Sequence, residues 1–336
     1  MKKLFNSRSS MADDMIAGFL AAWPDAAVIG KHPRVVRRRA LKIGKVSLLI
    51  GNGSGHEPIA MGFVGTGLLD ANVVGDVFVA PSPDLILEGI REVTGPAGAI
   101  LLISRHEGDV INGRTAAMMA EDEGFSVHPL LMYDDISSAP KGQEEDRRGA
   151  AGTIFIYKIL GAAAEAGLDL TALAELGAEV RDCTRTLGAA LNPGISPLTG
   201  QQMFSLPEDE VFIGMGVHGE PGVGRRKLGP VRELVAFMLD ALLQDRQISP
   251  GTRTLVLING MGGCTMMELL TVFGEVAAGL AARGIPQTAP MIGSFSTTQE
   301  MAGFSISLCT PTQRMLDFWQ APHGAPLFPD LHGVGA

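Results

Sequence analysis

The chain has 336 residues, of which 46% are hydrophobic and 19% are charged. This balance excludes a disordered chain, and the length suggests about two domains, each with a core of its own. The net charge of −9 disfavours a broad nucleic-acid-binding surface, because phosphate backbones attract basic proteins.

Three features predict a cytoplasmic location. The three cysteines are odd in number and widely spaced, so no disulfide framework is expected. Polar residues at Asn6–Ser10 interrupt any signal peptide, and no uncharged run is long enough to span a membrane. We expect neither a membrane nor a nucleic-acid partner, and the basic run His32–Arg39 is interpreted as a solvated or subunit-contact face.

The first half of the chain alternates between helical patterns and short apolar runs, which predicts parallel β-α-β units. An amphipathic helix is expected first and ends at Pro24, and Ser82 is a candidate N-cap of a later helix. Strands are expected at Val46–Ile50, Ala71–Ala80, Ala99–Ile103 and Ser126–Met132, and helices at Pro83–Val93, Ile111–Glu123, Arg148–Ala166 and Leu170–Thr186.

The second half predicts a smaller unit of the same class, after a linker at Asn192–Glu208 that is rich in Pro, Gly, Ser and Gln. Strands are expected at Val211–Val217, Thr254–Asn259, Gln287–Ser294 and Gly303–Leu308, and helices at Val231–Leu243 and Met266–Ala282. The predicted fold class is therefore α/β. It comprises an N-terminal domain over 1–191 and a smaller C-terminal domain over 192–336, with mostly parallel sheets and a substrate cleft between them.

The segment GNGSGHEP, from Gly51 to Pro58, directly follows a predicted strand. Its glycines allow close approach of the backbone to a ligand, and ligands of open α/β sheets bind beyond the carboxyl ends of strands. A tight turn would explain the glycines alone, but His56 and Glu57 directly after them favour a ligand site. The spacing does not match the G-x-G-x-x-G pattern of dinucleotide-binding loops.

The segment SRHEGDVING, from Ser104 to Gly113, follows another predicted strand and carries four ionisable residues. A carboxylate near an imidazole can exchange protons with a substrate hydroxyl. A solvated loop in which Asp109 caps the next helix is an equally good interpretation of this segment by itself.

The segment GMGVHGEPG, from Gly214 to Gly222, ends the first strand of the second half. Gly216 and Gly219 flank His218, so no bulky neighbour is expected to cover the imidazole, which favours a ligand group or nucleophile. No metal site is expected, because His56, His106, Asp109 and His218 lack the close spacing typical of metal ligands.

Several catalytic motifs are absent from the sequence. There is no G-x-x-x-x-G-K-[ST] loop, no protein-kinase signature and no G-x-S-x-G elbow. If the protein takes part in ATP chemistry, the nucleotide is expected on another chain.

In combination, these segments resemble a known family. GNGSGHEP, the stretch Gly62–Asp84, EGDV at Glu107–Val110, DRRGAAGT at Asp146–Thr153, GMGVHGEPG and INGMGGCTMMEL at Ile258–Leu269 occur in the order of the substrate-binding K subunit of dihydroxyacetone kinase. The resemblance covers essentially the whole chain and implies a homodimer of two-domain α/β subunits.

The resemblance also implies roles for individual residues. A short ketose would be held as a hemiaminal on His218, with His56 and Asp109 as the acid–base pair. The substrate-contacting positions would be Gly53, Ser54, Gly55, Ser104, Arg105 and His106. No cofactor is implied on this chain. ATP, or ADP recharged by a phosphotransferase-system protein, would be bound with Mg²⁺ by a partner L subunit, and the chain resembles the arrangement with separate subunits.

The sequence departs from the family pattern beside Asp109. Ser104 stands where the family usually has a substrate-contacting lysine, and Arg105, His106 and Glu107 replace its usual neighbours. This change predicts a ketose other than dihydroxyacetone, such as the tetrulose erythrulose. The alternative is a ligand-sensing transcriptional co-activator, which would keep His218 but would not need His56 and Asp109. Because both are present, an enzyme is favoured.

Overall fold

The computed structural model describes residues 2–331, and these form two compact units, each built around a six-stranded sheet. The first unit comprises 2–132, 154–180 and 315–330, and the second comprises 133–153, 181–314 and Leu331. The α/β class is confirmed. The units do not divide at residue 191, because the chain passes between them several times.

The sheet of the first unit has the order β1-β2-β4-β3-β5-β6. Its four strands from β4 to β6 are parallel, as the alternating pattern predicts, whereas β1 and β2 are joined antiparallel at the edge. The strands are β1 Ala27–Ile29, β2 Val35–Arg38, β3 Ser47–Ser54, β4 Ala71–Val77, β5 Ala99–Ser104 and β6 Val127–Met132.

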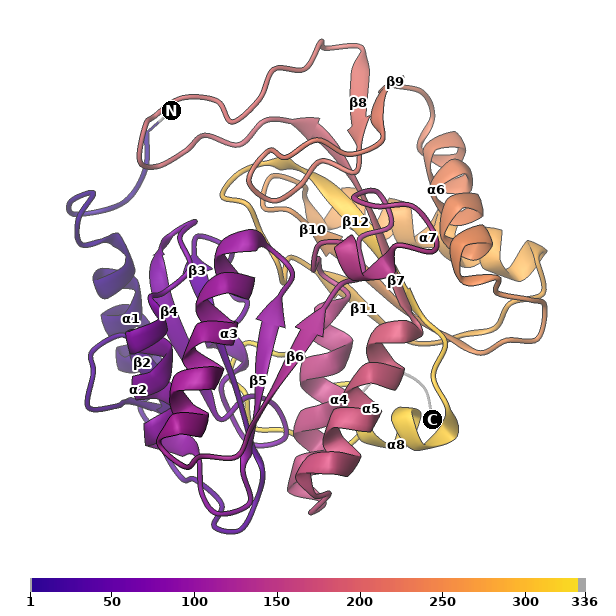
Figure 1. Cartoon of the computed structure of the whole chain (residues 1–336). Helices are drawn as coiled ribbons and strands as arrows, with labels where there is room; N and C mark the ends of the chain where they lie inside the picture. The colour runs from indigo at the N-terminus through magenta and orange to yellow at the C-terminus, as the bar shows by residue number, and fades with distance from the viewer. Residues whose placement is uncertain (1, 332–336) are drawn as a thin grey trace. The chain divides into compact units, whose positions relative to one another are not determined.

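Helices cover this sheet and bury its apolar faces. In Figure 1, α2 and α3 lie side by side in front of the sheet, where Ile86 and Ile90 join a core with the strand residues Leu49 and Val73. The hydroxyl of Ser82 caps α2 by accepting the Leu85 N–H at 3.3 Å, as expected. The helices of this unit are α1 Met11–Ala22, α2 Pro83–Val93, α3 Glu107–Asp122, α4 Thr153–Glu165, α5 Leu170–Asp182 and α8 Gln313–Trp319, with a 3₁₀ turn at Met61–Phe63.

The sheet of the second unit has the order β11-β10-β12-β7-β8-β9. Only β10 and β11 pair in parallel and the other four pairs are antiparallel, so the expectation of a mostly parallel sheet is wrong here. The strands are β7 Thr184–Asn192, β8 Glu210–Ile213, β9 Gly224–Lys227, β10 Thr254–Gly260, β11 Gln287–Gly293 and β12 Ala302–Cys309.

Two long helices, α6 (Val231–Arg246) and α7 (Met266–Ala282), pack against each other and against this second sheet (Figure 1). Leu239 and Leu242 of α6 and Val276 of α7 are fully buried with Val256 and Ile306 of the strands. A second 3₁₀ turn lies at Glu144–Asp146. The core of this unit therefore lies between the helix pair and the central strands.

The basic run His32–Arg39 is balanced by carboxylates and a carbonyl of its own unit. Arg34 pairs with Asp13 at 2.5 Å, Arg37 with Glu92 at 3.4 Å, and Arg39 donates to the Pro24 carbonyl at 2.8 Å. Arg38 is buried and pairs with Asp70 and Glu165. The expectation of a purely solvated or subunit-contact face is therefore wrong for Arg38, whose role is in the interior.

Among residues 2–331, no helix is long and apolar enough to cross a membrane.

Candidate functional site

In the first unit, the parallel strands β3, β4 and β5 end at one edge of the sheet, and the candidate residues gather there. Ser54 is the last residue of β3 and His56 lies two residues beyond it, whereas Ser104 is the last residue of β5. Parallel strands that neighbour one another bring their carboxyl ends together, which is where open α/β sheets bind ligands.

The first half of the glycine-rich segment, 51–54, belongs to strand β3, whereas the whole segment was expected in a loop after the strand. Gly53 pairs with Gly75 of β4, and a bulge follows at Ser54. A Cβ on Gly53 would lie 2.7 Å from the backbone nitrogen of Val79, so only glycine allows this approach. Gly55 has a φ of +101° and packs against Phe78.

His56 is buried, with its ring centroid 5.0 Å from that of Phe78. The neighbouring Glu57 carboxylate accepts the Gly55 N–H at 2.9 and 3.1 Å, and burial raises the pKa of this carboxyl. Ser54 is also buried, and its hydroxyl has no hydrogen-bond partner among the described residues. The segment thus presents an imidazole and an unused hydroxyl at the strand end.

A second cluster lies where β5 gives way to α3. Helix α3 begins at Glu107, four residues earlier than expected, so Asp109 lies in its first turn. The Ser104 hydroxyl lies 3.1 Å from Nδ1 of His106, and that nitrogen is 3.8 Å from a carboxylate oxygen of Asp109. The structure thus brings Ser104, His106 and Asp109 together, and the backbone N–H of Arg105 donates to Met132 of strand β6 at 3.2 Å.

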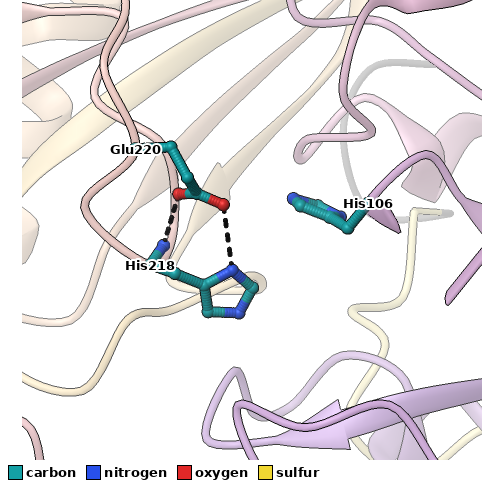
Figure 2. Close-up of side chains that lie close together, drawn as sticks. All are labelled: His106, His218 and Glu220. Carbon is teal, nitrogen blue, oxygen red and sulfur yellow. Dashed lines mark hydrogen bonds and ion pairs between the residues drawn. The ribbon is translucent and has the colours of Figure 1, made fainter. Parts of the chain in front are cut away.

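In the second unit, His218 lies in the loop that follows β8. Its backbone N–H donates to one carboxylate oxygen of Glu220 at 2.8 Å, and its Nδ1 lies 3.0 Å from the other oxygen, as Figure 2 shows. The side chain of His218 is 31% exposed. Burial favours the neutral form of Glu220, but hydrogen bonds and charge from His218 outweigh it and hold the pKa of this carboxyl well below its usual range.

The loop that carries His218 is held at both ends by Arg148. Its guanidinium donates to the carbonyl of Gly214 at 3.1 Å and to that of Pro221 at 3.3 Å, and it pairs with Asp135 at 2.8 Å. The hydroxyl of Ser137 also donates to Gly214, at 3.2 Å. These contacts fix the backbone on either side of the histidine.

Asp134 holds the segment that directly follows Arg148. Its carboxylate accepts the N–H groups of Ala150 at 2.7 Å and Gly152 at 2.9 Å, and burial raises its pKa to about 6. Glu220, Arg148, Asp135 and Asp134 were not among the expected site residues. The motifs did contain these residues. Glu220 stands two residues after His218, and Asp134 and Asp135 precede the Arg-Arg-Gly sequence that includes Arg148.

Fold and site together define a class: a two-sheet α/β protein with polar strand-end residues in one unit and a braced histidine loop in the other. Residues 17–327 match the model of the Dak1 domain, and the chain belongs to this family. The resemblance inferred from the motifs is thereby confirmed.

Three relatives illustrate the range of the family. The dihydroxyacetone-binding subunit DhaK of PTS-dependent dihydroxyacetone kinase 1 from Listeria innocua is 37% identical over 308 residues, which are 92% of this chain and 94% of that protein. A D-erythrulose kinase from Mycolicibacterium smegmatis is 37% identical over 98% of this chain, which spans only 56% of that longer protein. The solved structure of the dihydroxyacetone kinase operon co-activator Dha-DhaQ superposes with a TM-score of 0.88 at 31% identity, over 94% of this chain and 97% of the other.

Two of these three proteins are named as a kinase or a kinase subunit. The expectation that the chain belongs to a phosphotransferase family is therefore confirmed. The third is similar over almost its full length and carries the name of a co-activator.

Proposed function

We propose that the chain is the substrate-binding subunit of a ketose kinase and holds a short ketose covalently on His218. The observation that carries this proposal is the partly exposed imidazole of His218 in a glycine loop that Arg148 braces on both sides. A nucleophile that is fixed in place and open on one side is suited to attack a bound carbonyl carbon.

Covalent attachment would also select the substrate. An imidazole nitrogen adds to the electrophilic carbon of a ketone, whereas glycerol and other polyols offer no such carbon. In this proposal His56 and Asp109 handle the protons: one assists formation of the adduct, and the other accepts the proton of the hydroxyl that is phosphorylated.

The preferred ketose is proposed to be larger or more polar than dihydroxyacetone, for example a tetrulose such as erythrulose. Ser104 is shorter than the lysine usual in the family, and the imidazole of His106 lies 3.1 Å from its hydroxyl and 3.8 Å from Asp109, which offers a further polar contact to a larger ketose. The name of the D-erythrulose kinase relative supports a tetrulose, whereas the Listeria relative is named for dihydroxyacetone.

The phosphoryl donor is proposed to lie on a partner. The Listeria relative is named as one subunit of a PTS-dependent kinase, which supports a nucleotide-binding L subunit and a phosphotransferase-system donor. ATP or ADP with Mg²⁺ would be bound by that partner, and this chain would act as a cytoplasmic homodimer.

The test is the His218→Ala variant, incubated with dihydroxyacetone and erythrulose and examined by intact-mass measurement under native conditions. The variant is expected to form no adduct and to bind the ketose only weakly, through hydrogen bonds. His128→Ala removes an exposed imidazole from strand β6 and is the matched control, with adduct formation unchanged. An adduct that persists without His218, or crystallographic density joining a ketose carbon to another side chain, would refute the proposal.

The second candidate is a ligand-sensing co-activator, which the similarity to Dha-DhaQ favours. A sensor needs the covalent anchor but no proton transfer to phosphate, so the presence of His56 and Asp109 favours the kinase. Phosphorylation of a ketose in the presence of a partner L subunit would decide for the kinase. An adduct without any phosphoryl transfer would decide for the sensor.

A further inference from the structure

We infer that Glu220 is a positioning residue that fixes the tautomer of His218 and thereby leaves Nε2 as the nitrogen that attacks the ketone. The identity of the nucleophile rests on the proposed function. The tautomer is a property of the free protein and can be tested without any substrate.

The hydrogen bonds of Glu220 determine where the ring proton lies. One carboxylate oxygen accepts the backbone N–H of His218 at 2.8 Å, and the other lies 3.0 Å from Nδ1 (Figure 2). An ionised carboxylate can only accept hydrogen bonds, so Nδ1 must carry the proton in this contact. The lone pair of the neutral ring is then on Nε2.

Glu220 remains an acceptor because it stays ionised. Burial alone would raise its pKa, but the hydrogen bond and charge of His218 and the backbone N–H groups hold that pKa well below its usual range. Protonation of the carboxyl, which would turn it into a donor, is therefore disfavoured at any pH near neutrality.

The position of the carboxylate is also fixed by its surroundings. A Cβ on Gly216 would lie 2.2 Å from Oε2 of Glu220 and 2.5 Å from a guanidinium nitrogen of Arg148, so the carboxylate occupies space that only glycine leaves free. Arg148 in turn holds Gly214 and Pro221. Glu220 therefore keeps its contact with Nδ1 at little further cost in conformational entropy.

This arrangement suits the bond changes of adduct formation. The Nε2 lone pair forms the N–C bond while the π pair of the carbonyl moves to its oxygen, which takes a proton from a neighbouring acid. The ring retains the Nδ1 proton and becomes positively charged, and the Glu220 carboxylate offsets that charge. With the proton on Nε2 instead, no lone pair would be available for attack from that nitrogen.

Glu220→Gln is a sharp test because it changes only the hydrogen-bonding character of the group. The backbone N–H of His218 can only donate, so it will take the amide oxygen of the new side chain. The amide NH₂ then faces Nδ1, which must accept, and the proton is expected to move to Nε2. The substitution should therefore reverse the tautomer without changing the shape of the loop.

The readout is ¹⁵N NMR of the free protein labelled at histidine, with the signals of His218 assigned by their loss in His218→Ala. We expect Nδ1–H in the unchanged protein and mainly Nε2–H in Glu220→Gln. Glu220→Asp keeps an acceptor-only carboxylate and should keep Nδ1–H. Glu144→Gln is the matched control, because Glu144 accepts the N–H of Gly142 at 3.0 Å in the same i to i−2 geometry but has no imidazole beside it.

The second readout is the ketose adduct. Glu220→Gln is expected to raise the apparent Kd for adduct formation about 10–100-fold, by analogy with the removal of a group that orients a metal-bound histidine. An Nδ1–H ring in Glu220→Gln, or a reversed tautomer with unchanged adduct formation, would overturn the inference. If the unchanged protein forms no adduct, the proposed function fails, and the NMR result still decides whether Glu220 sets the tautomer.

Discussion

At the scale of single residues, substitutions of Asp109 and of His218 are expected to have different effects on the ketose adduct. In the proposed mechanism Asp109 accepts the proton of the hydroxyl that is phosphorylated, so Asp109→Asn should still form the ketose adduct but lose about 10²–10⁴-fold in the rate of phosphoryl transfer. Intact mass measures the first effect and a coupled kinase assay the second. Asp122→Asn, at the other end of α3 and exposed, is the control and should change neither. Loss of the adduct in Asp109→Asn would contradict this division of roles.

Lys158 is a fully buried lysine in helix α4, and its ammonium group donates to the carbonyl of Phe318 at 2.7 Å. Burial lowers the pKa of Lys158 from 10.5 to about 8. Between these two pH values the unfolded chain holds the proton and the native protein has released it. The free energy of unfolding should therefore rise with pH over this interval, by up to ~3 kcal/mol from this group.

The measurement is urea unfolding of the unchanged protein and of Lys158→Met from pH 7 to pH 10. The variant should lack this part of the rise, so the stability difference between the two proteins should change across the interval. Lys227→Met removes an exposed lysine and should keep the rise. Parallel curves for the unchanged protein and Lys158→Met would show that Lys158 titrates normally.

At the scale of elements, the close approach of β3 to the turn that follows β4 depends on glycine. Gly53→Ala would place a methyl group 2.7 Å from Val79 N and 3.1 Å from Phe78 C, both of them backbone atoms that cannot move aside easily. We expect a loss of ~1–3 kcal/mol in the free energy of unfolding. Gly18→Ala is the control, because Gly18 is exposed in α1 with nothing within 4 Å of its Cβ position, and it should gain up to ~1 kcal/mol. Equal stability of the two variants would argue against the tight packing at Gly53.

The bounds of a helix or strand are predicted correctly from the sequence where its hydrophobic pattern and its capping residues are clear. Helices α2 and α7 begin and end as expected, because their apolar periodicity is long and a serine or threonine caps each of them. The helix expected over Leu170–Thr186 overlaps only the first three residues of strand β7, and no element is expected over the rest of the strand. Its Leu, Gly and two Ala residues give no strand pattern, and pairing with β12 and β8 decides its conformation. The strands β1, β2 and β9 were not predicted, because each has only three or four residues and is too short to show a strand pattern.

The candidate site was predictable as a set of segments but not as a set of contacts. The histidines and Asp109 stand in motifs that can be recognised in the sequence. The contacts of Glu220 with His218 and of Arg148 with Gly214 depend on how the loop folds back on itself. The early start of α3, which places Asp109 in a helix, likewise follows from packing that no local pattern contains.

At the scale of the whole molecule, the buried arginines Arg38, Arg147 and Arg185 pair with carboxylates of their own unit. In the first unit, Arg38 and Lys45 pair with Asp70. In the second unit, Arg147 and Arg185 pair with Asp245 at 2.6 and 2.5 Å. The division of the chain was not predictable from composition, because 133–153 joins the second unit and 315–330 returns to the first. The linker pattern at Asn192–Glu208 predicts a single boundary, whereas the chain crosses between the units repeatedly.

The proposed kinase is expected to need a partner subunit for activity. Because the 336 residues contain no phosphate-binding loop for ATP, the purified chain should not transfer phosphate from ATP by itself. Addition of a matching L subunit with ADP or ATP and Mg²⁺ should yield a ketose phosphate. With Ser104 in place of a lysine, kcat/KM should be higher for a tetrulose than for dihydroxyacetone. The measurement is a reconstitution assay with both ketoses, and the L subunit alone is the control. Robust phosphorylation by the isolated chain would contradict the need for a partner, and a clear preference for dihydroxyacetone would contradict the role given to Ser104.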